Sequence, residues 1–215
     1  KFGAKKFIVY FQSFTNTYAP FSTLKALYEK ALSFDNVIGL SIGTRTDCVT
    51  DEILDYLVDL SKTKEIWIEY GIQSFFDETL IQINRGDSVS NMKYWINRSK
   101  EKGLNVCGHL IYGLPGENQE MMLETFKQTI ELNVDSIKFH PLYVVKNTLL
   151  TNEFKKGKFT PISEELYIDT VVKSIINLPS NISIQRITAG IDDDTLLSPS
   201  WCRDKHTQMK NIRLA

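Results

Sequence analysis

Short strands alternate with amphipathic helices along the whole chain, and this alternation restricts the fold more than any other feature of the sequence. Apolar residues at helical spacing, such as Phe21, Leu24, Tyr28 and Leu32, predict five helices, around residues 21–32, 50–58, 95–96, 121–132 and 163–175. Repeated strand–helix units require a parallel sheet, either an open doubly wound sheet or a barrel. The predicted strands are Phe7–Gln12, Val37–Ser41, Glu65–Tyr70, Asn105–Ile111, Ser136–His140 and Ile182–Thr188.

Composition agrees with one domain of this class. The chain has 215 residues, of which 42% are hydrophobic, and this is enough for a single large core. A net charge of -1 leaves no broad basic face for non-specific binding of nucleic acid, although a local basic patch stays open. No run approaches the roughly 18 apolar residues of a membrane span, so we expect a cytoplasmic protein that does not bind membranes.

The three cysteines, Cys48, Cys107 and Cys202, are odd in number and far apart in the sequence. This spacing favours reduced thiols that pack as small hydrophobic side chains over a disulfide framework or a metal site. The three histidines also lack metal-ligand spacing, and no Ser-His-Asp set is present. We therefore predict no metal ligands and no hydrolytic residues in this chain.

Polar or glycine-containing segments follow five of the predicted strands, where parallel sheets bind their ligands. Solvent exposure of loops explains one or two of these segments. It explains less well why Glu69 and Gln73 flank Gly71 in an apolar run, because partly buried carboxylates and amides need partners. In Cys107–Glu117 an apolar strand leads into a tight Gly/Pro turn that can bring main chain close to a ligand. The sequence therefore predicts a ligand site.

Five of these segments, in this order, resemble the radical SAM superfamily. More narrowly, they are similar to its YhcC-type branch, which is related to the elongator catalytic subunit and to oxygen-independent coproporphyrinogen oxidase. The resemblance covers nearly the whole chain and extends to Lys138–Leu142 and Pro199–Cys202. The segments that carry it are Tyr10–Pro20, Gly39–Asp47, Glu69–Ser74, Ile83–Gly86 and His109–Glu117.

The resemblance implies an α/β fold, a partial (β/α)6 TIM-like barrel that holds a [4Fe–4S] cluster and S-adenosylmethionine at the carboxyl ends of its strands. The family binds the cluster with three cysteines spaced C-x3-C-x2-C after its first strand, and this chain has no such triplet. Its first predicted strand matches the second strand of the family, so we expect the first βα unit and the ligand cysteines upstream of Lys1. Residues 1–190 would form the barrel core with strands two to six, and residues 191–215 a C-terminal tail that caps it.

By position, the resemblance implies cofactor contacts at twelve residues. Thr15–Thr17 takes the place of a glycine-rich stretch that contacts the methionine moiety, Gln73 and Arg85 match a pair near the methionine and ribose, and the main chain of Tyr112–Leu114 matches the adenine platform. For Arg85 a solvated helix-end cation stays open as an alternative, as does a core histidine for His109. No catalytic residue is predicted. The twelve residues are Thr15, Asn16, Thr17, Ser41, Arg45, Glu69, Gln73, Arg85, His109, Tyr112, Gly113 and Leu114.

The implied reaction is the reductive cleavage of S-adenosylmethionine to a 5'-deoxyadenosyl radical, which abstracts a hydrogen atom from the substrate. An electron donor such as flavodoxin or ferredoxin would supply the electron, and this chain alone is expected to be inactive. The elongator resemblance points to transfer RNA as substrate, with Lys138, His140, Tyr143 and Lys146 lining an entrance.

Two alternatives stay open beside this reading. The first is a cluster-free module that binds S-adenosylmethionine or another nucleotide without radical chemistry. The second is a barrel enzyme of another class, for which the sequence offers no nucleophile or metal site. If the first βα unit is missing, Phe7–Gln12 should lie at an exposed sheet edge, through which copies of the chain could associate.

Overall fold

The computed structural model describes residues 3–215, and these form two compact units. Unit 1 contains residues 3–72, 87–108 and 132–135. Unit 2 contains residues 73–86, 109–131 and 136–215. Lys1 and Phe2, at the start of the predicted barrel core, lie outside the described residues. No helix within residues 3–215 combines the length and the apolar character that a membrane crossing requires.

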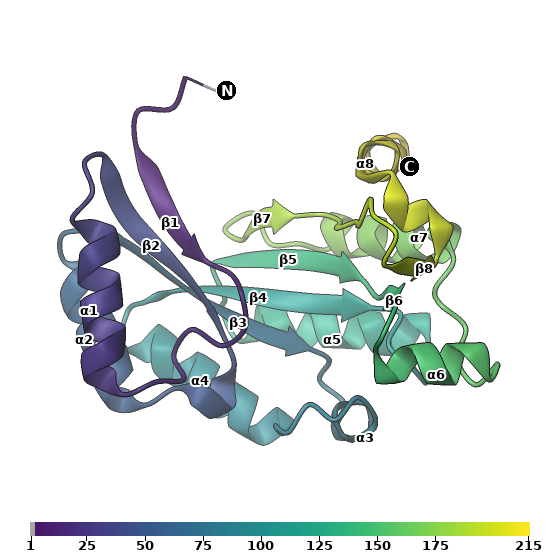
Figure 1. The fold of residues 1–215 in the computed structure, drawn as a ribbon, viewed down its shortest axis with the longest axis horizontal. Coiled ribbons are helices and arrows are strands. Elements are labelled where there is room, and N and C mark those ends of the chain that lie inside the picture. The colour runs from purple at the N-terminus through teal and green to yellow at the C-terminus, as the bar shows by residue number, and fades with distance from the viewer. Residues whose placement is uncertain (1–2) are drawn as a thin grey trace. The chain divides into compact units, whose positions relative to one another are not determined.

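Six strands form one sheet, whose order follows the chain (Figure 1). The pairs β1–β2, β2–β3 and β5–β7 are parallel. In a doubly wound sheet, the strand order reverses at a switch point. Here the strands follow one another in chain order without a reversal, as they do in a barrel. The predicted class, an α/β fold with the topology of a partial (β/α)6 TIM-like barrel, is therefore confirmed. The strands are β1 (Phe7–Phe11), β2 (Val37–Thr44), β3 (Glu65–Gln73), β4 (Asn105–Tyr112), β5 (Ser136–Pro141) and β7 (Ser183–Arg186).

All six predicted strands exist; two of them extend three residues beyond their predicted ends, and the bounds of the other four differ by one or two residues. β2 continues past Ser41 to Thr44, and β3 continues past Tyr70 to Gln73. The glycines of these segments, Gly43 and Gly71, suggest turns, whereas the ladder runs on with Gly43 paired to Glu69. Ser41 and Glu69 are therefore strand residues rather than residues of the loops that follow.

Eight α-helices complete the described chain. The predicted helices correspond to α1, α2, α4, α5 and α7, and polar N-caps begin several of them: Thr50 accepts a hydrogen bond from Ile53 N, and Ser163 accepts one from Leu166 N. The sequence pattern did not reveal the three shorter helices α3, α6 and α8. The helices are α1 (Phe21–Leu32), α2 (Asp51–Ser61), α3 (Asp77–Gln82), α4 (Val89–Glu101), α5 (Gln119–Glu131), α6 (Leu149–Lys155), α7 (Glu164–Ile176) and α8 (Lys205–Leu214).

Each unit packs one face of its strands against its own helices. In unit 1, the buried Tyr70 of β3 shares a hydrogen bond with Ser99 of α4 at 2.8 Å between their hydroxyl oxygens. In unit 2, Tyr112 of β4 is hydrogen-bonded to Ser174 of α7 at 2.8 Å, and its ring lies 5.4 Å from that of Phe139 on β5. Side chains alternate along a strand, so the neighbours of these residues form the opposite face in each unit.

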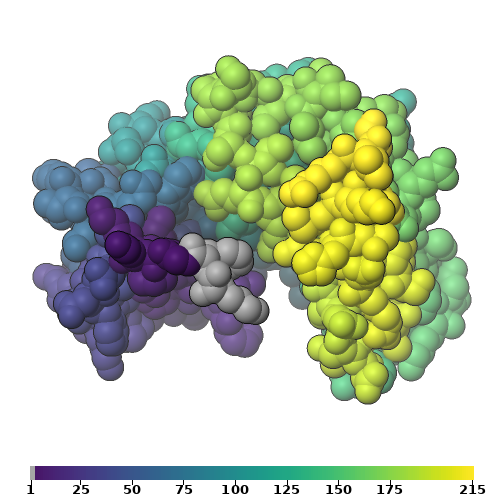
Figure 2. All heavy atoms as spheres, turned by 90° about the horizontal axis from the view of Figure 1, so that it is seen from above, coloured from purple at the N-terminus to yellow at the C-terminus, as the bar shows by residue number. Residues whose placement is uncertain are grey.

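The last part of the chain is ordered within unit 2. A short antiparallel pair, β6 (Val144–Val145) with β8 (Leu196–Ser198), precedes the helix α8. Gln208 of α8 is buried and donates a hydrogen bond to Trp201 O at 2.9 Å. Figure 2 shows these C-terminal residues, in yellow, gathered at the surface beside the green residues of unit 2. Residues 191–215, predicted as a tail, thus form elements that pack on unit 2.

Candidate functional site

A buried carboxylate is the main polar feature of the strands in unit 1. Glu69 is 2% exposed, and its two oxygens accept hydrogen bonds from Ser41 Oγ at 2.5 Å and from Tyr10 Oη at 2.8 Å. The register pairs Tyr10 with Ser41 and Gly43 with Glu69, so three adjacent strands deliver the three side chains. A buried charge is costly unless hydrogen bonds compensate for lost hydration. Tyr10 was not among the predicted site residues, because its hydrogen bond to Glu69 depends on how the strands pair.

The predicted stretch Thr15–Thr17 joins the loop after β1 to the end of β2. Asn16 donates hydrogen bonds to Phe11 O at 3.0 Å and to Gly43 O at 2.9 Å. Thr17 is buried, donates to Cys48 O at 2.7 Å and shares a 2.5 Å hydrogen bond with Thr44 Oγ1. These side-chain groups therefore have partners inside unit 1. Thr15 is half-buried, and its side chain and the main chain of the loop are the parts of this stretch that suit a ligand.

Arg45, predicted near the cofactor, follows β2. Its guanidinium forms a two-pronged ion pair with Asp47, with Nε–Oδ1 at 2.7 Å and Nη2–Oδ2 at 2.5 Å. The hydrogen bond to this carboxylate raises the pKa of Arg45, so its charge is constant at physiological pH. A carboxylate that bound to this fork would have to displace Asp47.

A cavity of about 650 Å³ opens in unit 1 where the loops after β1 and β2 enter their helices. Residues from the first turns of α1 and α2 line it together with Thr17 and Asp47. Of the six site residues predicted in unit 1, only Thr17 lines this cavity. It is therefore a poor candidate for the predicted ligand site.

In unit 2, a ligand at the turn after β4 would meet main chain rather than the side chain of Tyr112. The side chain of Tyr112 is fully buried toward Phe139 and Ser174, and burial raises the pKa of its hydroxyl. Gly113 adopts a φ of +90°, and a Cβ there would lie 2.7 Å from Ile162 Cβ. Only glycine suits this position, because it tolerates positive φ and leaves room for Ile162. Contact of Tyr112–Leu114 with a ligand through the main chain stays a prediction; within the fold, Tyr112 O accepts a hydrogen bond from Leu142 N at 2.8 Å, and Gly113 N donates one to Met122 Sδ at 3.1 Å.

Glu117 connects the same turn to the end of β3. Its Oε1 accepts a hydrogen bond from the hydroxyl of Ser74, which follows Gln73. Burial raises the pKa of Glu117, and the hydroxyls of Ser74 and Thr79 partly oppose this increase. Gln73 itself is half-buried with a φ of +68°, an unusual conformation for a residue with a side chain. Sequence reasoning included Glu117 in the motif without predicting its contact with Ser74.

His109 and Arg85 complete the predicted residues of unit 2. His109 is half-buried in β4, and the alternation along the strand places it on the face opposite Tyr112. Arg85 lies three residues beyond α3, where its main-chain N donates to Leu80 O at 2.8 Å, and its side chain is half-buried. The alternative of a solvated helix-end cation is thus less suitable for Arg85 than a role within the fold.

A basic group lies at the carboxyl ends of β5 and β7 in unit 2. Lys138, only 8% exposed, is paired in the ladder with Arg186. The ring of His140 lies 5.0 Å from that of Tyr143, and its Nδ1 lies 2.7 Å from Pro141 O. Burial first, and then the positive charge of Arg186, lower the pKa of His140 to about 4, so its ring is neutral at pH 7. The sequence analysis did not single out Arg186. The one signal for it is that a charged residue lies near the end of a predicted strand.

Metal ligands do not cluster in the described residues. Between residues 3 and 215, no three or more His, Cys, Asp or Glu side chains lie close enough together to hold a metal ion. Cys107 and Cys202 are buried and Cys48 is half-buried, all three as free thiols. Burial raises the pKa of Cys202 to about 12, so this thiol stays protonated.

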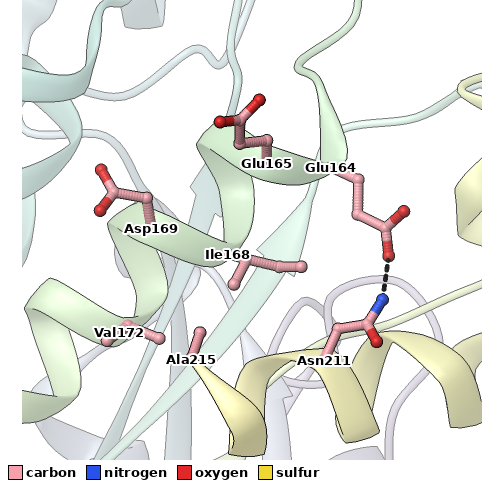
Figure 3. Close-up of a pocket in the computed structure, with 7 residues that line it drawn as sticks. All are labelled: Glu164, Glu165, Ile168, Asp169, Val172, Asn211 and Ala215. Atoms are coloured by element: carbon pink, nitrogen blue, oxygen red, sulfur yellow. Dashed lines mark hydrogen bonds between the residues drawn. The ribbon is translucent and has the colours of Figure 1, made fainter.

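A second hollow, of about 610 Å³, lies between α7 and α8 in unit 2 (Figure 3). Three carboxylates of α7 line it, and one of them, Glu164, accepts a hydrogen bond from Asn211 Nδ2 at 3.0 Å. None of the twelve predicted site residues contributes to its lining. The hollow is therefore separate from the predicted cofactor residues.

Two family models match the chain. The model of the Radical SAM superfamily matches residues 1–129, and the model of the Radical_SAM C-terminal domain matches residues 134–214. Protein YhcC of Escherichia coli K12 is 39% identical over 210 residues, which are 97% of this chain and 68% of that protein. Protein MJ0486 of Methanocaldococcus jannaschii is 41% identical over 203 residues, which are 94% of this chain and 63% of that protein.

More distant relatives include a tRNA uridine(34) acetyltransferase of Methanocaldococcus infernus, 30% identical over 72% of this chain and 29% of that protein. Among solved structures, the Elp3 protein of M. infernus superposes with a TM-score of 0.70 at 24% identity, over 89% of this chain and 45% of that chain. Coproporphyrinogen III oxidase (HemN) of E. coli gives 0.57 at 23% identity, over 75% of this chain and 37% of that chain. These two likenesses concern the fold. The chain spans about two thirds of the length of its nearer relatives and less than half of the more distant ones.

Proposed function

This chain belongs to the radical SAM superfamily, and we propose that, within a longer protein, it binds S-adenosylmethionine at the carboxyl ends of its strands for radical chemistry. The observation that carries the proposal is the turn after β4. There the side chain of Tyr112 is buried and Gly113 has a positive φ, so a planar ring placed at the turn would face main chain rather than the Tyr112 side chain. Such a turn suits a nucleoside base, because main chain can approach the ring closely there.

The polar groups of the chain also match the chemical groups of S-adenosylmethionine. In unit 1, the carboxylate of Glu69 suits an ammonium group. In unit 2, the guanidinium of Arg85 suits a carboxylate through two parallel hydrogen bonds, and the imidazole of His109 suits a ribose hydroxyl. The contributions of these residues are binding and orientation, which are the main tasks of a protein that uses a reactive cofactor.

The described residues do not fit a [4Fe–4S] cluster, because its cysteine ligands must lie together and the three cysteines here do not. We propose that the ligand cysteines belong to another part of the longer protein. Bound together, the cluster and S-adenosylmethionine supply one-electron reductive cleavage and hydrogen-atom abstraction. A reductant such as flavodoxin or ferredoxin would then be the electron donor.

For the substrate, we propose an RNA, with transfer RNA as the first choice. This rests on the similarity to a protein that is named a tRNA uridine(34) acetyltransferase. A second candidate function is a cluster-free module that binds S-adenosylmethionine or a nucleotide. The lack of clustered metal ligands in residues 3–215 favours this alternative.

The test uses the full-length protein, purified without oxygen and reconstituted with iron and sulfide. With dithionite and S-adenosylmethionine we expect 5'-deoxyadenosine, detected by mass spectrometry. Replacing His109 by Ala should weaken S-adenosylmethionine binding at least tenfold, whereas the exposed His206 is the matched control and its Ala variant should bind normally. Binding without a cluster and without cleavage would instead support the cluster-free module. A protein that does not bind S-adenosylmethionine at all would contradict both.

A further inference from the structure

A local basic patch lies in unit 2, in the segment around α6. Residues 146–158 contain four lysines and one acidic residue, Glu153, although the whole chain has a net charge of -1. Glu153 is paired with Lys158, whose Nζ lies 3.8 Å from its Oε2. The other three lysines, Lys146, Lys155 and Lys156, have no further acid in the segment, and all three are exposed. The segment is therefore a basic patch on a chain that is otherwise slightly acidic.

A cavity of about 520 Å³ opens in this patch, and we call it the α6 cavity. Its lining includes Lys146 and Lys155, the side chains of Asn147 and Asn152, and no acidic residue. Within residues 3–215, neither lysine forms an ion pair, and neither asparagine side chain forms a hydrogen bond. Leu149, which is 80% exposed, adds an apolar surface. The α6 cavity thus offers positive charge and hydrogen-bond donors that no other described side chain occupies.

Asp193 is the acid on which Lys146 acts electrostatically, but it does not line the α6 cavity. Thr195 donates two hydrogen bonds to Oδ1 of Asp193, from its main-chain N at 2.7 Å and from its hydroxyl at 2.5 Å. These hydrogen bonds are the main cause of the lowered pKa of Asp193, and the charges of Arg203 and Lys146 contribute less. Asp193 is therefore held by Thr195, and the ammonium group of Lys146 stays accessible to a ligand.

The backbone around the α6 cavity is fixed at the carboxyl end of β5. The chain leaves β5, pairs as β6 with β8, and then enters α6 (Figure 1). Lys146 N donates to Thr195 O at 2.8 Å, and the hydroxyl of Thr151 in α6 donates to Val145 O at 2.5 Å. The α6 cavity therefore lies on the side of unit 2 where β5 ends, which is the side where parallel sheets bind their ligands.

We infer that the α6 cavity binds the phosphate backbone of the RNA substrate through Lys146 and Lys155. Lys155 ends α6 and Lys146 precedes it, so the length of the helix, about 9 Å, separates them. Exposed charges spread in this way gain little from one small anion in salt solution. Each of them releases a counterion, however, when it contacts a phosphate of a polyanion. The inference rests on the proposed function and specifies where its RNA is held.

The experiment measures the binding of a fluorescently labelled transfer RNA transcript to the full chain by fluorescence anisotropy, in sodium chloride from about 50 to 200 mM. K146Q and K155Q should each reduce the slope of log K against log salt by about 1, and the double variant by about 2. The double variant should also weaken binding at least fivefold. K30Q/K62Q removes the same charge from exposed lysines at the ends of α1 and α2 in unit 1, and this matched control should bind normally.

Three results would overturn the inference. The first is an equal loss of affinity in K146Q/K155Q and K30Q/K62Q, both folded by circular dichroism, because only the net charge would then matter. The second is displacement of the RNA by inorganic phosphate but not by sodium chloride of the same ionic strength, because the cavity would then hold a single small anion. The third is a wild-type chain that does not bind the RNA. Binding of S-adenosylmethionine is measured in the same samples, so failure of the cofactor proposal is seen separately.

Discussion

Glu69 and Arg45 of unit 1 differ from Arg186 of unit 2 in how their charges are compensated. In unit 1, the carboxylate of Glu69 is held by two hydroxyls and the guanidinium of Arg45 by Asp47. In unit 2, Arg186 has no carboxylate within the described chain, and the nearby His140 stays neutral. The two charged groups of unit 1 are thus held by other side chains of that unit, whereas the Nε of Arg186 in unit 2 is buried without a hydrogen bond. The contrast is between charged groups that neighbouring side chains fix and one that has no acidic partner in the described chain.

The largest expected effect on this comparison is that of pH, because all three histidines lie in unit 2. Burial, Arg186 and His109 lower the pKa of His140 from 6.5 to about 4, so protonation favours the unfolded chain. The stability that the neutral ring confers is complete above pH 6.5 and is lost as the pH falls toward 4. This loss should amount to about 2–3 kcal/mol.

Urea unfolding between pH 7.5 and 4.5 measures this loss. H140Q should remove most of the pH dependence attributed to this ring, whereas H206Q, at an exposed histidine of α8, should not change it. The facing ionisable groups are His109, Tyr143 and Arg186. Identical pH profiles for wild type and H140Q would show that His140 does not distinguish unit 2 from unit 1.

The second prediction compares glycines with positive φ, one in each unit. G113A in unit 2 should lower the free energy of unfolding by about 2 kcal/mol, because the new Cβ meets Ile162 and the backbone there is strained for a residue with a side chain. Gly103 in unit 1 has a φ of +83°, but no atom lies within 4 Å of a Cβ added there. G103A should therefore lower the free energy of unfolding by only about 1 kcal/mol. Denaturant curves give both values, and equal losses would remove the steric argument for Gly113.

The third prediction tests whether the carboxylate of Glu69 in unit 1 depends on the hydroxyls that donate to it. Y10F removes one of the two hydroxyls that donate to Glu69 and should cost about 1–2 kcal/mol of stability. Y18F is the matched control, because Tyr18 is 79% exposed, and its effect should be close to zero. Thermal unfolding followed by circular dichroism distinguishes the two. A neutral Y10F would mean that the carboxylate does not depend on this hydroxyl.

The fourth prediction is that removing the charge of Arg186 does not lower the stability, as the removal of a paired charge does. R186M should keep the stability of the protein or raise it by about 0.5–1 kcal/mol, since no partner is left behind. K100M in unit 1 should lower the stability by about 1 kcal/mol, because Lys100 is paired with Asp135 at 2.5 Å. Urea titrations at pH 7.5 compare them. A clear loss of stability in R186M would show that Arg186 already has a stabilising role.

The fifth and smallest effect concerns the two ends of the sheet, β1 and β7. β1 exposes Phe7, Ile8 and Tyr10, with Ile8 at 42%, whereas β7 exposes Gln185. We propose that copies of the chain associate weakly through β1, as exposed apolar edge strands do. Sedimentation at increasing concentration should show association that I8K reduces and Q185K does not. A chain that stays monomeric at all concentrations would contradict this proposal.

Much of the fold can be predicted from the sequence, because strand and helix periods are local properties. The six strands and five of the helices follow from the pattern, whereas the lengths of β2 and β3 do not, since the ladder overrides the turn tendency of Gly43 and Gly71. The site is different. Glu69 stands out as a carboxylate in an apolar run, but Tyr10 and Arg186 gain their meaning from strand pairing between distant segments, which no local pattern contains.

The side chain of Asn16 has a mechanical consequence. Its amide Nδ2 donates to the main-chain carbonyl of Phe11, the last of β1, and to that of Gly43 near the end of β2. The main-chain carbonyl of Asn16 accepts a hydrogen bond from the hydroxyl of Tyr28 in α1 at 2.5 Å. Two strand ends and a helix are thereby clamped at one residue. Because one residue ties both strand ends to α1, we expect β1, β2 and α1 to move together when the end of β2 is displaced.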